Sequence, residues 1–124
     1  MKQAPSHKQR LGKTGETIAS RYLTAKGYRI IEKNFRTHNG EIDLIAVTND
    51  TLVFVEVKTR IGHIFGLPEE AVTKRKFHQI RRVAHLYKSL HPKLPEALRI
   101  DVISIEFDHR ERKGKLRFFK GVSL

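Results

Sequence analysis

The feature that most constrains the fold is a pair of alternating apolar runs, residues 41–47 and 52–58, separated by the short segment TNDT. Alternation with a period of two is typical of β-strands, and Asn and Asp tolerate tight turns, so the runs predict an antiparallel hairpin. The second run is almost entirely apolar, yet it ends with Glu56 and Lys58. An unpaired charge on a buried strand is unfavourable by several kcal/mol, so these two charges require compensation.

The hairpin register indicates what that compensation is. With residues 48–51 as the loop, Asp43 lies opposite Glu56, and Glu41 lies opposite Lys58. Opposed Cβ atoms are about 4.5–5.5 Å apart, and two carboxylates at that distance repel unless a cation lies between them. Two carboxylates with a main-chain carbonyl and waters suit Mg²⁺, or Mn²⁺ in its place. Phosphodiester hydrolysis requires a polarised phosphorus, a deprotonated water and a stabilised anionic transition state, which a metal ion and an adjacent ammonium can supply. On register alone, a solvated face with ordinary cross-strand ion pairs is an equal alternative.

The charge balance indicates the class of partner. The 124 residues include 25 Lys and Arg against 13 Asp and Glu, a formal net charge of +12. Such an excess favours a polyanion, and nucleic acid is the first candidate because phosphate contacts release counterions. Neither a run of about 20 apolar residues nor a signal-like N-terminus is present, so we expect a cytoplasmic protein that does not cross a membrane. The chain has no cysteine, and its seven His form no tight pair, so no zinc site is expected.

The rest of the chain divides into an arm and one domain. Residues 1–13 carry four basic side chains and no acid, which predicts a flexible basic arm, and residues 14–124 are long enough for a single core. Helical spacing predicts a helix over 14–26 that Gly27 stops, and a second over 73–90 with Thr73 as its N-cap. Further strands are expected at 28–36, as an edge strand, and at 99–107 and 115–120, as a second pair. The predicted order is α-β-β-β-α-β-β.

These residues also carry a resemblance. Asp43, followed thirteen positions later by EVK, resembles the core motif of the restriction-endonuclease-like, or PD-(D/E)XK, nuclease superfamily, although Ile42 stands where the literal motif has Pro. The wider string of GETIASRYL, GEIDLI, VFVEVKTR, Gly66, the pair at 71–72 and Lys76 is similar to the YraN-like family within it, akin to Holliday-junction resolvases. The similarity covers about residues 11–107. It implies an α/β fold with a restriction-endonuclease-like core, in which helices flank a mixed central sheet.

The resemblance also implies a site. Asp43 and Glu56 would be the metal-binding carboxylates, with the carbonyl of Val57 as a third ligand. Lys58 would position the attacking water and stabilise the transition state. Glu16 matches a helical Glu that completes the metal site directly or through water, and its alternative is an acid favoured by the helix macrodipole.

Two functions follow from these observations. The first is a metal-dependent endonuclease for branched or otherwise structured DNA, and the second is a nucleic-acid-binding module that keeps the fold without turnover. An intact set of Asp43, Glu56 and Lys58 favours the first, because a binding module does not need a like-charged pair. Phosphate contacts are expected from the arm, from the basic face of the helix over 73–90 and from the residue after VEVKT, at Lys8, Arg10, Lys13, Arg60, Lys74, Lys76 and Arg81.

Some points are left open by the sequence. Lys76 matches a basic residue on the helix after the hairpin, but a solvated charge on a basic face explains it equally well. Asp101 has no expected role beyond a cap or an ion pair, and Tyr22 is expected in the core. Symmetric cutting of two strands would call for a twofold homodimer. The sequence distinguishes neither the oligomeric state nor junction, flap, duplex and single-stranded substrates.

Overall fold

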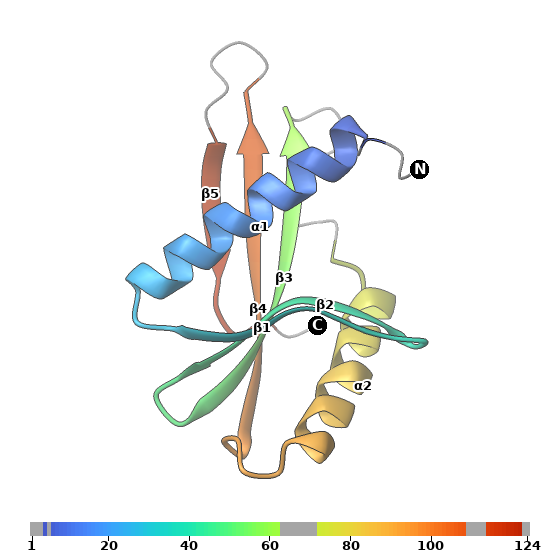
Figure 1. The fold of residues 1–124 in the computed structure, drawn as a ribbon, viewed down its shortest axis with the longest axis vertical. Coiled ribbons are helices and arrows are strands. Elements are labelled where there is room, and N and C mark those ends of the chain that lie inside the picture. Colours follow the sequence, from blue (N-terminus) through green and yellow to red (C-terminus); the bar gives the residue numbers. More distant parts are fainter. Residues whose placement is uncertain (1–3, 5, 63–71, 109–113, 123–124) are drawn as a thin grey trace.

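The protein is described by a computed structural model that covers residues 4, 6–62, 72–108 and 114–122. Two helices and five strands follow one another in the predicted order, and the α/β class is confirmed (Figure 1). Their bounds are His7–Ala25 for α1, Arg29–Thr37 for β1, Gly40–Thr48 for β2, Thr51–Ile61 for β3, Lys74–Leu90 for α2, Ala97–Phe107 for β4 and Gly114–Phe119 for β5. Gly66 and Ala71, which belong to the motif string, lie outside the described residues.

All five strands form one mixed sheet in the order β1-β2-β3-β4-β5. β3 and β4 are parallel, and α2 connects them, because two parallel neighbours need a crossover between the end of one and the start of the other. The remaining neighbours are antiparallel. The two strand pairs expected from the sequence are therefore joined through β3 and β4, and β1 is an edge strand as predicted.

A helix packs on each face of the sheet. Alternate residues of β3 point to opposite faces, so Val53 and Val55 pack with α1, and Leu52 and Phe54 pack with α2. Figure 1 shows α1 crossing β3, β4 and β5, with α2 beside the lower half of the sheet. Neither helix is long and apolar enough to cross a membrane. Tyr22 packs against the core on the α1 side, as expected.

The start of α1 corrects one prediction. The helix begins at His7, seven residues before the predicted start, so residues 7–13 belong to α1 and not to an arm. The reason is a capping box, in which Ser6 Oγ accepts from the N–H of Gln9 and the Gln9 side chain accepts from the N–H of Ser6. The other predicted helix signals are confirmed: Gly27 follows α1 with a φ of +93°, and the Thr73 side chain accepts from the N–H of Lys76.

The β1–β2 hairpin bends away from β3, and this bend creates the site. β2 and β3 are paired only as far as Leu44, beyond which the hairpin passes toward α2 (Figure 1). Strict alternation would place Ile42 on the same face as Leu44, yet Leu44 packs on the α1 side and Ile42 on the α2 side. The strand therefore turns about its own axis at Asp43. On the neighbouring strand, Asn34 lies opposite Asp43 and has a φ of +53°.

Candidate active site

The end of the β2–β3 ladder determines where Asp43 lies. The ladder follows the predicted register as far as Leu44 opposite Val55 and stops there. At the next position Asp43 Oδ2 accepts a hydrogen bond from the backbone N–H of Val57, with an N···O distance of 2.8 Å. This side-chain bond takes the place of the missing ladder bond, and it holds the carboxylate in the fork between the two strands.

The predicted pairing of Glu41 with Lys58 is wrong, because the two strands have separated before these positions. Glu41 instead forms an ion pair with Arg36 of β1, its cross-strand partner, at 3.3 Å. Lys58 turns to Glu56, two residues earlier on the same face of β3. The bend thus brings Glu41 toward the carboxylates rather than toward the ammonium.

Asp43 lies in a strongly acidic environment. Its pKa is raised from 3.8 to about 7, first by burial and next by the charge of Glu56, with smaller increases from Glu16 and Glu41. The hydrogen bond from Val57 opposes this rise, because it stabilises the ionised form. Carboxylates from α1, β2 and β3 therefore all disfavour the ionised form of Asp43, and a cation beside it would relieve their repulsion.

Glu56 is buried, with 4% of its surface exposed, and two ammonium groups compensate its charge. Glu56 Oε1 lies 3.2 Å from Nζ of Lys58 and 3.7 Å from Nζ of Lys76 in the first turn of α2. Among the described residues, Lys58 and Lys76 balance the buried negative charge of Glu56 through these ion pairs. Lys76 thus touches the site, which favours its role there over that of a merely solvated charge.

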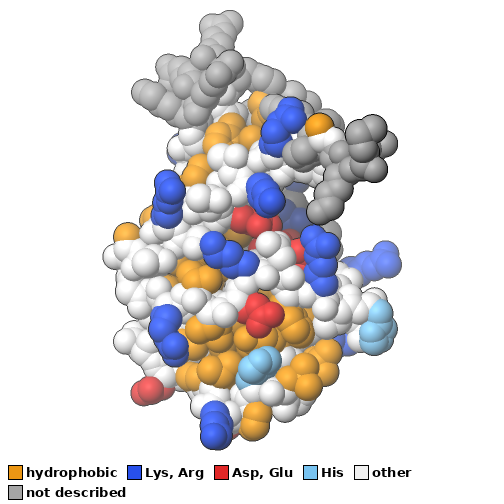
Figure 2. All heavy atoms as spheres, in the orientation of Figure 1, with side chains coloured by type: hydrophobic (Ala, Val, Ile, Leu, Met, Phe, Trp, Pro, Cys, Tyr) orange, Lys and Arg blue, Asp and Glu red, His pale blue; other side chains and the backbone are white. Residues whose placement is uncertain are grey.

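A cleft of about 500 Å³ opens between α1 and the β1–β2 hairpin, and Asp43 lies in it. Figure 2 shows acidic side chains near the centre of this face, with Lys and Arg side chains on several sides and hydrophobic side chains below. Cations beside an acidic centre match a substrate that carries phosphates around one reactive position. The cleft is lined by Gln9, Arg10, Gly12, Lys13, Glu16, Asn34, Arg36, Glu41 and Asp43.

Asn34 organises two of these carboxylates, and the sequence interpretation missed it. Its amide is oriented with the nitrogen toward them, because only this orientation pairs a donor with each acceptor: Nδ2 lies 3.1 Å from Oε1 of Glu16 and 3.1 Å from Oε1 of Glu41. The left-handed backbone at position 34 turns the amide into the cleft, and Asn tolerates this conformation better than most residues. An Asn inside an otherwise β-rich run was the available signal.

A glycine brings Glu16 to the cleft. A Cβ at Gly15 would lie 2.0 Å from Cγ2 of Thr59, so only glycine permits this approach of α1 to β3. Glycine inside a helix is unfavourable by roughly 0.5–1 kcal/mol relative to alanine. Its presence inside the predicted helix is therefore a signal for a close contact.

The donor set can be compared with the needs of a metal ion. No three His, Asp or Glu side chains in the described part of the chain lie close enough together to hold an ion as they stand. Mg²⁺ does not need such a cage, because it is usually bound by one or two carboxylates, with waters and substrate phosphates as the other ligands. Asp43 and Glu56 fit this pattern. The roles of Asp43, Glu56, Glu16 and the Val57 carbonyl as metal ligands stay predictions.

The predicted phosphate-binding residues fall into three groups. Arg10 and Lys13 line the cleft. Lys74 is exposed at the start of α2, two residues before Lys76, whereas Arg81 lies further along α2 beside a different depression. Arg60 is half-buried on β3 near Lys58 in sequence, and the side chain of Lys8 lies outside those that the structure describes.

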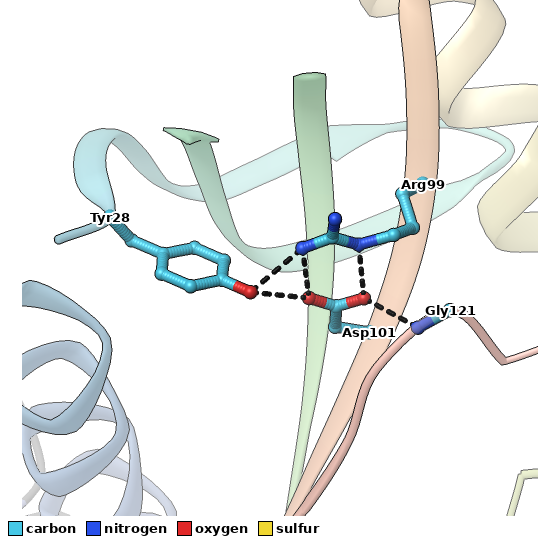
Figure 3. A network of polar contacts seen from close by, with 4 residues as sticks. All are labelled: Tyr28, Arg99, Asp101 and Gly121. Atoms are coloured by element: carbon cyan, nitrogen blue, oxygen red, sulfur yellow. Dashed lines mark hydrogen bonds and ion pairs between the residues drawn. The ribbon is translucent and has the colours of Figure 1, made fainter. Parts of the chain in front are cut away.

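Asp101 has a structural role, in agreement with the expected ion pair. It is fully buried, and its two carboxylate oxygens lie 2.9 Å from Nε and 3.1 Å from Nη2 of Arg99 (Figure 3). The Tyr28 hydroxyl donates to it at 3.3 Å and the N–H of Gly121 at 2.8 Å. Burial is the main reason that the pKa of Tyr28 is raised. This network ties β4 to the segments before β1 and after β5, and it is separate from the cleft.

The chain matches, over residues 15–105, the sequence profile described as the uncharacterised protein family UPF0102. The chain belongs to this family. Among UPF0102 proteins, that of Parafrankia sp. (strain EAN1pec) is 47% identical over 109 residues, covering 88% of this chain and 90% of the other. Those of Syntrophomonas wolfei and Symbiobacterium thermophilum are 48% and 49% identical, covering 77% and 79% of this chain and 83% of each relative.

Membership of UPF0102 confirms the resemblance at the level of the family that we described as YraN-like. The matched region begins at Gly15 and contains Glu16, Asp43, Glu56 and Lys58. The link from UPF0102 to the nuclease superfamily stays a prediction.

Proposed function

We propose that this UPF0102 protein is a metal-dependent endonuclease that hydrolyses phosphodiester bonds of structured or branched DNA. The observation that supports this most directly is the fork between β2 and β3. There, Asp43 has a pKa raised to about 7 by burial and by Glu56, and it opens onto a cleft whose lining also includes Arg10, Lys13 and Arg36. A carboxylate kept in such surroundings at the expense of stability is typical of a functional site.

The residues of the fork would have two roles, metal binding and stabilisation of the transition state. Asp43 and Glu56 would hold Mg²⁺, with the carbonyl of Val57 and waters as further ligands. When bound, Mg²⁺ would polarise the phosphate and lower the pKa of a coordinated water. Lys58, whose ammonium already lies 3.2 Å from Glu56 Oε1, would contact the scissile phosphate as negative charge builds on its oxygens.

The cleft would position the DNA around that phosphate. Arg10 and Lys13 of α1 and Arg36 of β1 lie along its lining, and they would contact phosphates on either side of the reactive one. Asn34 would act as a positioning residue, because its amide nitrogen lies within hydrogen-bond distance of Glu16 and Glu41 and would fix these two carboxylates beside Asp43. Such contacts depend on backbone geometry rather than base sequence, which suits a structure-selective enzyme.

A second candidate function is a binding module without turnover. The ion pairs of Glu56 with Lys58 and Lys76 favour it, because they already balance one of the two carboxylates of the fork without a metal ion. In that case the basic rim would bind nucleic acid and the fork would be a structural ion-pair cluster.

Cleavage assays distinguish the two functions. Labelled four-way junctions, flaps, duplexes and single strands would be incubated with the protein and Mg²⁺, Mn²⁺ or EDTA. An endonuclease should cut at least one substrate with metal and none with EDTA. If the wild type cuts none of them with either metal, the binding module is the correct function.

Lys58→Met tests the proposed role of the ammonium. We expect cleavage at saturating Mn²⁺ to fall by about 10² or more, the scale of losing one charge-stabilising donor, while DNA affinity changes only by one phosphate contact. Lys93→Met, which removes the same charge from the exposed loop after α2, is the matched control and should cut like the wild type. Equal cleavage by wild type and Lys58→Met would leave Lys58 as an ion-pair partner only.

A further inference from the structure

A second depression lies outside the cleft, between α2 and β4. It is a groove of about 380 Å³ with Phe77, Arg81 and His85 of α2 on one side and Leu98, Ile100 and Val122 on the other. Its floor is apolar, since Ile100 and the side chains beneath it belong to the core between α2 and the sheet. The volume is at the small end of the roughly 300–1,000 Å³ that small-molecule sites occupy, so it suits one planar group rather than a duplex.

The charges around this groove are positive. Arg81 is exposed, and with His85 it also lines a shallow depression along the outer face of α2 that includes His78 and Arg82. No Asp or Glu is present among the described residues that line either depression. An apolar groove with a cationic rim is complementary to a planar group that carries an anion.

The groove is also close to the proposed site along the same helix. Lys76 of α2 contacts Glu56, and Arg81 follows five residues later, a rise of about 7.5 Å at about 1.5 Å per residue. Five residues also turn by about 140° around the helix axis, so a nucleic-acid strand that leaves the site would reach the groove by passing around α2. Aromatic side chains beside a basic path are the usual platform for unpaired bases.

We propose that the groove between α2 and β4 binds one unpaired nucleotide, with the base against Phe77 and the phosphate at Arg81 and His85. This rests on the proposed function only in its choice of nucleic acid, since the groove would bind the strand whether or not the fork cuts it. A base within a duplex is stacked and paired, so the groove selects substrates with unpaired nucleotides, such as single strands, flaps and open junctions.

The test is a binding measurement in EDTA, where neither metal nor turnover contributes. Fluorescence anisotropy would compare labelled oligothymidylate with a strand of the same length in which the bases are replaced by abasic sites. Both strands have the same phosphates, so the ratio of their affinities reports contacts with bases alone. We expect the wild type to prefer the base-containing strand by roughly five- to hundredfold, the range for stacking one base.

Three variants assign that preference to the groove. Val122→Trp fills the groove without removing a charge, and Phe77→Ala removes the platform; each should reduce the preference to nearly one. Arg81→Ala should weaken binding and shrink the preference, because the phosphate no longer holds the base in place. Arg75→Ala, the matched control, removes a charge from an exposed position of α2 outside both depressions, so it should weaken both strands equally.

The outcomes separate this proposal from the proposed function. The proposal that the groove binds a nucleotide is wrong if the wild type shows no preference for the base-containing strand, or if Val122→Trp retains the full preference. Either result holds even if the protein cuts DNA. Since Phe77 is half-buried, a loss of folding in Phe77→Ala is checked by circular dichroism, and Val122→Trp then decides alone. If the wild type prefers the base-containing strand and Val122→Trp abolishes this preference, nucleotide binding in the groove is established, even if no substrate is cut.

Discussion

Asp43→Asn is the substitution that isolates the electrostatics of the fork. The amide has nearly the shape of the carboxylate, and its oxygen can still accept the hydrogen bond from the N–H of Val57, but it cannot ionise. A rise in pKa from 3.8 to about 7 at about 1.4 kcal/mol per pKa unit makes the ionised group roughly 4 kcal/mol less stable in the folded chain than in the unfolded one. The variant lacks this penalty, so it should be more stable than the wild type at neutral and alkaline pH.

The sign of the effect follows from proton binding. Between pH values of about 4 and 7, the folded protein binds more protons at Asp43 than the unfolded chain does, so the free energy of unfolding of the wild type falls as the pH rises through this window. Below it, the carboxyl group is protonated in both states and the penalty is absent. Above it, the penalty is complete. The stability advantage of Asp43→Asn should therefore grow from near zero at about pH 4 to roughly 2–4 kcal/mol at about pH 8.

Urea denaturation in EDTA at several pH values across this window measures the advantage directly. Asp50→Asn, which changes an exposed acid in the β2–β3 turn, is the matched control and should stay within about 0.5 kcal/mol of the wild type throughout. At the alkaline end, Mg²⁺ should stabilise the wild type and leave Asp43→Asn unchanged, because a ligand stabilises only the state that binds it. An advantage that is the same at every pH would refute the electrostatic account of the fork.

Three further predictions concern the surroundings of the site. Gly15→Ala should lower the free energy of unfolding by about 1–3 kcal/mol in urea denaturation, because its Cβ would clash with the stiff side chain of Thr59. Gly12→Ala is the control: a Cβ there meets open space, so this substitution should not destabilise the protein. Asp101→Asn should cost about 3–5 kcal/mol in the same assay, since it leaves the Arg99 guanidinium without its buried partner. DNA affinity should fall with salt at a log–log slope near −4 if about four exposed α2 cations each contact a phosphate, and an affinity that ignores salt would contradict this.

Local signals in the sequence were sufficient for most of the fold. The hairpin register was correct up to Leu44 opposite Val55, because two alternating runs and a short polar turn allow few alternatives. Thr73 correctly predicted the start of α2, and Gly27 correctly predicted the end of α1. Both signals depend only on residues that are close together in the sequence. These are properties of short segments, and a single sequence contains them.

The features that were missed depend on contacts between distant segments. Alternation alone predicts a ladder that continues to Glu41 and Lys58, because it contains no sign of where two strands separate. The turn of β2 at Asp43 is visible only in the fold. The amide of Asn34 on β1 contacts Glu16 on α1. The two residues are far apart in the sequence, so no local pattern predicts their contact. The early start of α1 is different, because it depends on a capping box of Ser6 and Gln9, which are neighbours in the sequence. The apolar spacing that predicts the helix begins only further along the chain.

The two carboxylates of the fork are compensated unequally, and this difference bears on function. Glu56 is buried beside two ammonium groups, so the ordinary rule that buried charges are paired accounts for it. Burial and three neighbouring acids raise the pKa of Asp43, and the N–H of Val57 only partly offsets them. An asparagine at position 43 would accept the same hydrogen bond without that penalty. Stability therefore explains Glu56 but not Asp43, and a bound cation would supply the missing reason for its charge.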